Sequence, residues 1–121
     1  MPGVSAYEML DRLGTPGGVR ALLVLASNIV VSAPNAKQLD RRLGKLDLLV
    51  VADPFLSETA ARADVVLPVC QWAESAGTTT NLEGRVLFRR RAADPPAGVR
   101  SDLEVLKLLA SALGQPHAIL D

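Results

Sequence analysis

Two polar residues, Asn28 and Asp53, stand where a binding site would be expected. Each follows an apolar run of strand length, Val19–Ala26 and Leu48–Ala52. Because ligands of open parallel sheets bind beyond the carboxyl ends of the strands, the two side chains should share one edge. A carboxylate can accept two hydrogen bonds from a ribose diol or a guanine edge, and an amide can both donate and accept. The alternative is that both residues only cap helices or turns.

Two other features could carry chemistry, and each has a plainer interpretation. Cys70 lies near Trp72 and is the only cysteine. It fits a small packed hydrophobe better than a nucleophile or ligand, because no base accompanies it. The segment Arg85–Arg91 holds four arginines. It could bind phosphate, lie in solvent, or face a partner domain.

The usual catalytic and phosphate-binding motifs are missing from the sequence. There is no G-x-G-x-x-G, no G-x-x-x-x-G-K-[ST] and no G-x-S-x-G. The only histidine, His117, lies four residues from the end, so neither a triad nor a histidine metal site is expected. One cysteine excludes a disulfide framework, a zinc cluster and a self-contained iron–sulfur cluster. We therefore assign no catalytic residue and no metal ligand, and an independent small enzyme is disfavoured.

Composition narrows the classes of partner. The chain has 121 residues with 13 basic and 13 acidic side chains. A net charge of zero gives no field for nucleic acid or for an anionic membrane. No apolar run approaches the roughly 20 residues that span a bilayer, and the N-terminus lacks the features of a signal peptide. We expect a soluble, cytoplasmic chain that binds no nucleic acid and does not insert into a membrane.

The elements that must position these residues alternate along the chain. Helices are predicted over 5–13, from Pro34 or Asn35 to Leu43, and over 57–63, while 27–32 is predicted to be a loop. Strands are predicted over 19–26, 48–52 and 64–67, and such apolar runs are typical of strands buried on both faces. This order predicts an α/β fold with a small parallel sheet and flanking helices.

The second part of the chain has a different character. Residues 69–100 are polar and rich in Gly, Thr and Arg, so we expect a long loop there. A helix over 101–114 should begin at a capping box of Ser101 and Glu104 and end at Gly114. We expect one α/β segment over 1–121, with its core in 18–68.

Several local motifs occur together in one order. They are Ser57-Glu58-Thr59-Ala60, Ala63-Asp64-Val65-Val66-Leu67-Pro68, Trp72-Ala73-Glu74, Gly77-Thr78, Asn81 and Glu83-Gly84-Arg85-Val86. Together they resemble the molybdopterin oxidoreductase family, which includes nitrate reductases, formate dehydrogenases and the large iron–sulfur subunit of NADH dehydrogenase. The resemblance extends from Gly18 to Pro116 and is nearest the nitrate reductase and formate dehydrogenase branch. It implies a Rossmann-like fold that is part of the family's pterin-dinucleotide-binding domain.

The resemblance also implies a cofactor and its contacts. Enzymes of this family hold molybdenum or tungsten between two molybdopterin guanine dinucleotides. The contacts of one dinucleotide would fall on six residues here: Asn28, Ser32, Ala52, Asp53, Ser75 and Asp102. Asp102 has a competing role as an acidic residue in the first turn of a helix.

Departures from the family pattern limit what this chain can do. Many relatives have Asn-Pro where Asn28-Ile29 stands, lysine at Ser75 and glutamine at Leu87. The cysteine cluster, the metal-ligating domain and the C-terminal β-rich domain are also missing. We therefore expect a fragment, a truncated reading frame or a split subunit that is not catalytic alone, with the rest of the enzyme or a second copy as partner. The alternative is an interaction module that docks on an oxidoreductase subunit, such as the large iron–sulfur subunit of NADH dehydrogenase, through its last helix and the arginines.

Overall fold

The computed structural model describes residues 3–115, so Pro116 and His117 lie outside the described residues. The chain divides into two compact units, residues 1–67 and 68–121, which are described separately below. This division does not test the expected organisation as a single segment, which stays a prediction.

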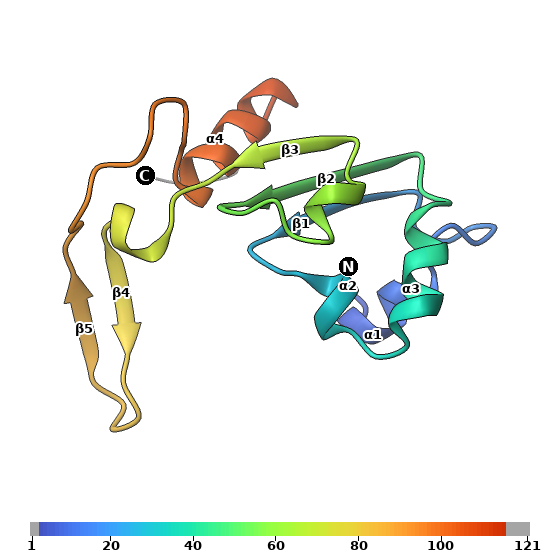
Figure 1. Ribbon diagram of the computed structural model, residues 1–121, viewed down its shortest axis with the longest axis horizontal. Coiled ribbons are helices and arrows are strands. Elements are labelled where there is room, and N and C mark those ends of the chain that lie inside the picture. The colour runs from blue at the N-terminus through green and yellow to red at the C-terminus, as the bar shows by residue number, and fades with distance from the viewer. Residues whose placement is uncertain (1–2, 116–121) are drawn as a thin grey trace. The chain divides into compact units, whose positions relative to one another are not determined.

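A parallel sheet forms the centre of the N-terminal unit. Its strands are β1 (Ala21–Leu25), β2 (Leu48–Asp53) and β3 (Val65–Pro68), in the order β1-β2-β3 (Figure 1). β1 pairs with β2 in parallel, from Ala21 opposite Leu48 to Leu25 opposite Ala52. The predicted α/β fold with a small parallel sheet and flanking helices is confirmed.

Short helices connect and cover these strands. They are α1 (Ala6–Asp11), α2 (Ile29–Ser32), α3 (Ala36–Leu43) and the 3-10 turn η1 (Ala60–Arg62). The prediction of a loop over 27–32 is wrong, because the amides of Val31 and Ser32 bond to the Asn28 carbonyl and close a helical turn. The residues Ile29, Val30 and Val31 are β-branched and have low helix propensity, so the sequence did not indicate this helical turn.

The core of this unit is aliphatic and occupies one face of the sheet. Alternate strand residues pack with the helices, and the buried set is Leu13, Leu22, Val24, Leu39, Leu43, Leu49, Val51 and Ala60. On the other face, Leu23 and Val50 are only half-buried, whereas Ala52 near the end of β2 is fully buried. The continuous apolar runs had predicted burial on both faces, but the helices of this unit contribute to one face only.

The C-terminal unit contains more regular structure than its composition suggests. A 3-10 turn, η2 (Trp72–Glu74), precedes a hairpin of β4 (Gly77–Thr80) and β5 (Val86–Arg89), and α4 (Asp102–Ala112) follows. The prediction of a long loop over 69–100 is therefore wrong for the hairpin. The predicted last helix is confirmed, with Ser101 and Glu104 forming both bonds of the capping box.

The hairpin turn explains why this polar segment folds back. The Asn81 side-chain oxygen accepts hydrogen bonds from the amides of Glu83, at 3.0 Å, and Arg85, at 2.9 Å. Gly84 has a φ of +79°, the left-handed conformation that a three-residue hairpin loop needs after a type I turn.

Among the described residues, no helix is long and apolar enough to cross a membrane.

The position of Leu49 gives a first test. Leu49 is 2% exposed in the central strand, whereas its neighbour Leu48 is 42% exposed. Leu49→Ala should lower the free energy of unfolding by about 2–5 kcal/mol, because it leaves a cavity in the core. Leu48→Ala should lower it by under about 1 kcal/mol. Urea denaturation followed by circular dichroism compares the two, and equal losses would contradict the described packing.

Candidate functional site

An open cavity lies at the carboxyl end of β1 and β2. Its volume is about 520 Å³, and it is lined by Ala26, Ser27, Asn28, Asp53, Pro54, Phe55, Ser57 and Glu58. Asn28 and Asp53 therefore line the same cavity, at the sheet edge where the topology places ligands. The expectation that the ends of these strands bring the two side chains together is met.

The backbone at the end of β1 bends sharply at the rim of this cavity, which is formed by the lining residues given above. Ala26 has a φ of +48°, a left-handed conformation that is unusual for a residue with a side chain. Its amide donates to the carbonyl of Ala52 at 2.9 Å, which fixes the bend to the neighbouring strand. Ala52 itself is fully buried and is not among the residues that line the cavity.

Asp53 organises the loop after β2. One carboxylate oxygen accepts the amide of Phe55 at 2.9 Å, and the other accepts the Ser57 hydroxyl at 2.9 Å. The turn-capping role that the sequence left open for Asp53 is thus present. Each carboxylate oxygen has a further lone pair, so these two bonds do not exhaust the acceptor capacity of Asp53.

Asn28 ties the two loops together. Its side-chain oxygen accepts the hydroxyl of Thr59 at 2.9 Å and the Thr59 amide at 3.3 Å. Its amide nitrogen donates to a carboxylate oxygen of Glu58 at 2.6 Å. Thr59 is fully buried, and its hydroxyl accepts the amide of Val30 at 3.1 Å. The orientation of the Asn28 amide is therefore fixed by a buried partner.

The charge of the rim is negative. The hydrogen bond from Asn28 lowers the pKa of Glu58 most, with smaller contributions from its own backbone and Arg62, so this carboxyl is ionised at neutral pH. Asp53 and Glu58 are the charged residues of the cavity lining, which contains no lysine or arginine. Such a rim accepts hydrogen bonds from uncharged donors and repels phosphate.

The remaining predicted contacts lie elsewhere. The Ser32 hydroxyl donates to the Asn28 carbonyl at 3.0 Å and is not part of the cavity lining. Ser75 and Asp102 belong to the C-terminal unit. Ser75 lines a second cavity of about 590 Å³, with Cys70, Glu74, Arg91, Ser101 and Glu104 among its neighbours. One carboxylate oxygen of Asp102 is buried without a hydrogen-bond partner among the described residues.

Cys70 fits the plainer of its two interpretations. Desolvation raises the pKa of its thiol, and the nearby carboxylates of Glu74, Glu104 and Asp102 raise it further. The thiol is therefore protonated at neutral pH and is a poor nucleophile.

Six residues that line the cavity were not among the predicted contacts: Ala26, Ser27, Pro54, Phe55, Ser57 and Glu58. Ser57 and Glu58 were singled out from the sequence only within the motif Ser57-Glu58-Thr59-Ala60. Their signal was the position of Ser57, four residues after Asp53, which allows the hydroxyl to return to the carboxylate. Phe55 gave no such signal, because an aromatic residue beside Pro54 is ordinary in a turn.

Comparison with known proteins decides the family. A sequence profile described as "Molybdopterin oxidoreductase" matches residues 1–112. This chain belongs to the molybdopterin oxidoreductase family. Membership of the family implies a molybdopterin cofactor.

The relatives that this chain matches are much longer than the chain itself. The assimilatory nitrate reductase catalytic subunit of Bacillus subtilis is 42% identical over 93% of this chain, which spans 16% of that protein. The F420-dependent formate dehydrogenase subunit alpha of Methanocaldococcus jannaschii is 44% identical over 93% of this chain, again 16% of its length. Among solved structures, acetylene hydratase from Pelobacter acetylenicus superposes with a TM-score of 0.80 and 28% identity, over 89% of this chain and 15% of that chain.

The Asn28 interaction gives a second test. Asn28→Ala should raise the pKa of Glu58 toward its ordinary value, because it removes the main cause of the lowering. Since that pKa is lowered by folding, the interaction stabilises the fold above the ordinary glutamate pKa and loses its effect as pH falls through the lowered one. A carbon-detected NMR titration of the Glu58 carboxyl measures this. Arg62→Ala should raise the pKa less, and an unchanged pKa in Asn28→Ala would contradict the described contact.

Proposed function

We propose that this chain is a molybdopterin guanine dinucleotide-binding segment of a molybdenum oxidoreductase of the nitrate reductase or formate dehydrogenase type, and that it is not catalytic by itself. One observation supports this most: Asn28 and Asp53 line a single cavity at the carboxyl edge of the parallel sheet. The six-fold greater length of the relatives supports the view that the catalytic parts lie outside this segment.

The chemistry of the rim fits the nucleoside end of the cofactor. Guanine and ribose present N–H and O–H donors without charge, and the free lone pairs of Asp53 and Glu58 can accept them. Phe55, which is 62% exposed at the rim, offers an apolar face against a base. Ser27 adds a hydroxyl beside Asn28. These residues would hold and orient the guanosine.

The phosphates of the dinucleotide need a different environment. The cavity lining has no cation, and the resemblance to the family implies that a lysine is common at the position of Ser75. The unpartnered oxygen of Asp102 could accept a hydrogen bond from the bound group, which supports its assignment. In an intact enzyme the cofactor would supply the redox chemistry, and this segment would supply orientation and hydrogen bonds. Because part of the site is missing, we expect weak binding.

Partners and location follow from the same proposal. The matched relatives are described as subunits, so association with the rest of an oxidoreductase fits this chain. We place that assembly in the cytoplasm. A docking module is the second candidate, and the leucines on α4 favour it, because Leu103, Leu108 and Leu113 are each at least half exposed.

Titration with guanosine diphosphate tests the proposed function. Amide NMR signals of Asn28, Asp53 and Phe55 should shift during the titration. Asp53→Asn should weaken binding about tenfold, because a charged acceptor is lost. The matched control is Asp47→Asn, since Asp47 precedes the same strand at its opposite end and pairs with Arg20 at 2.5 Å.

Two outcomes would count against a retained nucleoside site. One is the absence of shifts at Asn28 and Asp53 at millimolar nucleotide. The other is equal weakening by Asp53→Asn and Asp47→Asn.

A further inference from the structure

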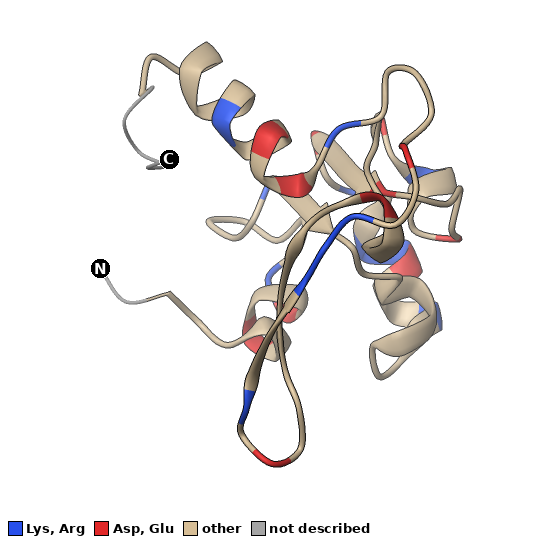
Figure 2. Cartoon of the chain, turned by 90° about the vertical axis from the view of Figure 1, so that its left-hand side faces the viewer, with Lys and Arg blue, Asp and Glu red and all other residues tan. Residues whose placement is uncertain are grey.

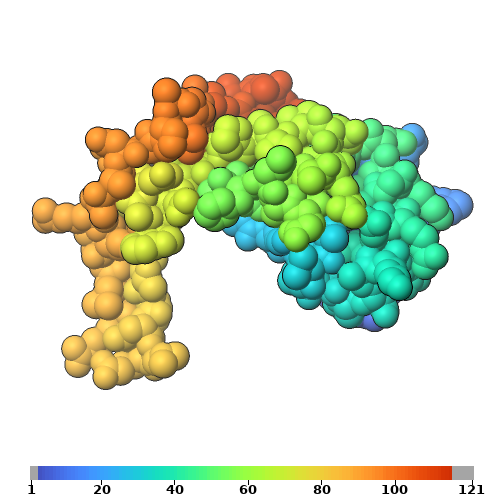
Figure 3. All heavy atoms as spheres, in the orientation of Figure 1, coloured from blue at the N-terminus to red at the C-terminus, as the bar shows by residue number. Residues whose placement is uncertain are grey.

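The hairpin of β4 and β5 presents an apolar surface that its own unit leaves open. Leu82, Val86, Leu87 and Phe88 are all more than half exposed, and Leu82 at the tip is fully so. In the space-filling view, no other part of the C-terminal unit covers the visible side of the hairpin (Figure 3). Val86 and Phe88 alternate with Leu87 along β5, so these two lie on one face of the hairpin, and exposed apolar side chains grouped in this way indicate an interaction surface.

The hairpin is anchored firmly at its base. Arg89 donates to the carbonyl of Ser75 at 2.6 Å, and its guanidinium lies 5.7 Å from the centre of the Trp72 ring. The amides of Ala92 and Ala93 both donate to the carbonyl of Ala73, at 2.8 and 3.1 Å. These contacts hold the base in place and leave the distal half of the hairpin without support from its unit.

The outer edge of β4 is open for strand pairing. The amide of Asn81 bonds to the Arg85 carbonyl, and the register runs from Thr80 opposite Val86 to Gly77 opposite Arg89. Hydrogen-bonded pairs alternate in an antiparallel ladder, so the amides of Thr78 and Thr80 point away from β5. Neither amide has another backbone partner in the described part of the chain.

Nothing in β4 protects that edge. Exposed edges are usually blocked by charged side chains or proline, and β4 reads Gly-Thr-Thr-Thr. A two-stranded hairpin is only marginally stable alone, and a third strand with an apolar face completes such a sheet. The edge of β4 therefore has the properties of an acceptor for an added strand.

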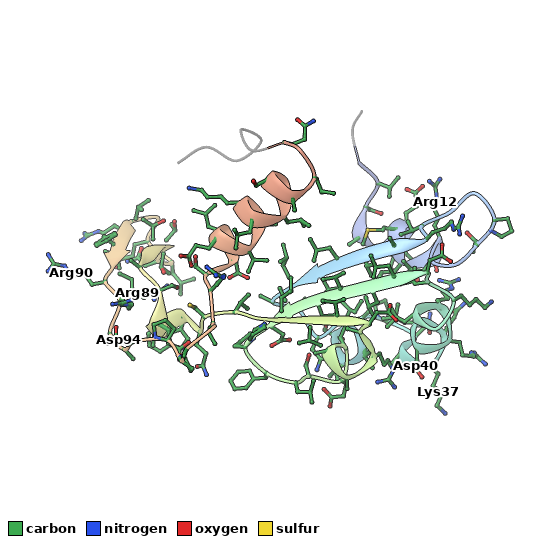
Figure 4. All side chains as sticks on the ribbon, turned by 90° about the horizontal axis from the view of Figure 1, so that it is seen from above. Arg12, Lys37, Asp40, Arg89, Arg90 and Asp94 are labelled. Carbon is green, nitrogen blue, oxygen red and sulfur yellow. The ribbon has the colours of Figure 1, made fainter. Side chains whose placement is uncertain are left out.

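Charge argues against a second copy as the occupant. Residues 77–94 contain four arginines and two acids, Glu83 and Asp94, so two hairpins would bring like net charge together. Figure 2 shows the basic residues along one strand of the hairpin and an acidic residue at its tip. Arg90 is exposed and points away from the ribbon (Figure 4). A strand with apolar side chains and a nearby carboxylate fits better.

We propose that the β4 edge accepts an extended strand from the part of the oxidoreductase that lies outside this segment. Side chains on one face of the added strand would lie beside Thr78 and Thr80, which share that face of the hairpin with Val86 and Phe88. Relatives have about six times the length of this chain, so polypeptide to supply the strand is present in them. The mode is β-strand addition, in which main-chain bonds give affinity and alternate side chains give specificity.

Hydrogen exchange distinguishes the open edge from the paired one. In this chain alone, the amides of Thr78 and Thr80 should exchange rapidly. In the intact Bacillus subtilis nitrate reductase catalytic subunit, the amides aligned with them should exchange at least about tenfold more slowly. Equal rates in the two proteins would overturn the proposal. The isolated chain is also measured at increasing concentration. If the amides of Thr78 and Thr80 become protected as the concentration rises, a second copy is the occupant, and this result would also overturn the proposal.

Proline variants test which edge is used. Thr80→Pro removes an outward amide, and Val86→Pro removes the matching outward amide of β5. Each is placed in a chimera that carries this chain in place of the matched segment of the Bacillus subtilis enzyme. Thr80→Pro should lower the melting temperature of the chimera and leave that of this chain unchanged, while Val86→Pro should do neither. Equal effects in the chimera would overturn the assignment to β4.

These measurements are independent of the proposed nucleoside site. The guanosine diphosphate titration reports on residues of the N-terminal unit, and the exchange experiment reports on the hairpin. The unmodified relative keeps the exchange test valid even if the chimera does not fold.

Discussion

The hydrogen bonds between the side chains of Asn28 and Thr59 are the constraint on which the candidate site depends. Thr59 is fully buried, and its hydroxyl links the Asn28 side chain to the backbone at Val30. The segment after β1 and the loop after β2 are therefore joined by a polar network as well as by apolar packing of Ile29 and Ala60 in the core. A buried network of this kind is specific, because each group that loses its partner leaves another one unsatisfied. The same network directs the Asn28 amide toward Glu58 and fixes a carboxylate at the cavity rim.

Apolar and polar residues have separate roles in the N-terminal unit. Leucine and valine side chains on one face of the sheet fix the register and direction of β1 and β2. The ends of those strands place Asn28 and Asp53 at the carboxyl edge of the sheet, where the side chains of short polar residues form the hydrogen bonds of the loops. The sheet supplies position, and the loops supply hydrogen-bonding capacity. This arrangement matches what an orienting segment of a larger enzyme needs, since it requires no catalytic group of its own.

The sequence predicted the part of the structure that periodicity controls. The three strands, α3 and α4 follow from apolar spacing and capping residues, and the strand ends predict that Asn28 and Asp53 share a cavity. The short helix α2 was missed, because β-branched residues form it under the control of tertiary contacts. The hairpin was missed because its residues are exposed, so no alternation of apolar and polar residues marks its strands, and because its turn depends on the Asn81 side chain. The contacts of Thr59 could not be predicted, since they join residues about 30 positions apart. The predicted site roles of Ser32, Ser75 and Asp102 stay predictions.

The left-handed bend at Ala26 has a consequence for how tightly this rim can hold a small molecule. An alanine at a φ of +48° stores about 1–2 kcal/mol relative to ordinary backbone. A glycine would remove that strain. It would also give the free loop many more conformations, which would be lost when a small molecule binds in the cavity. With alanine, the strain is a cost of folding, and the loop has fewer conformations to lose when a small molecule binds in the cavity. Alanine at this position can therefore favour binding, because the loop loses less conformational entropy when a ligand binds.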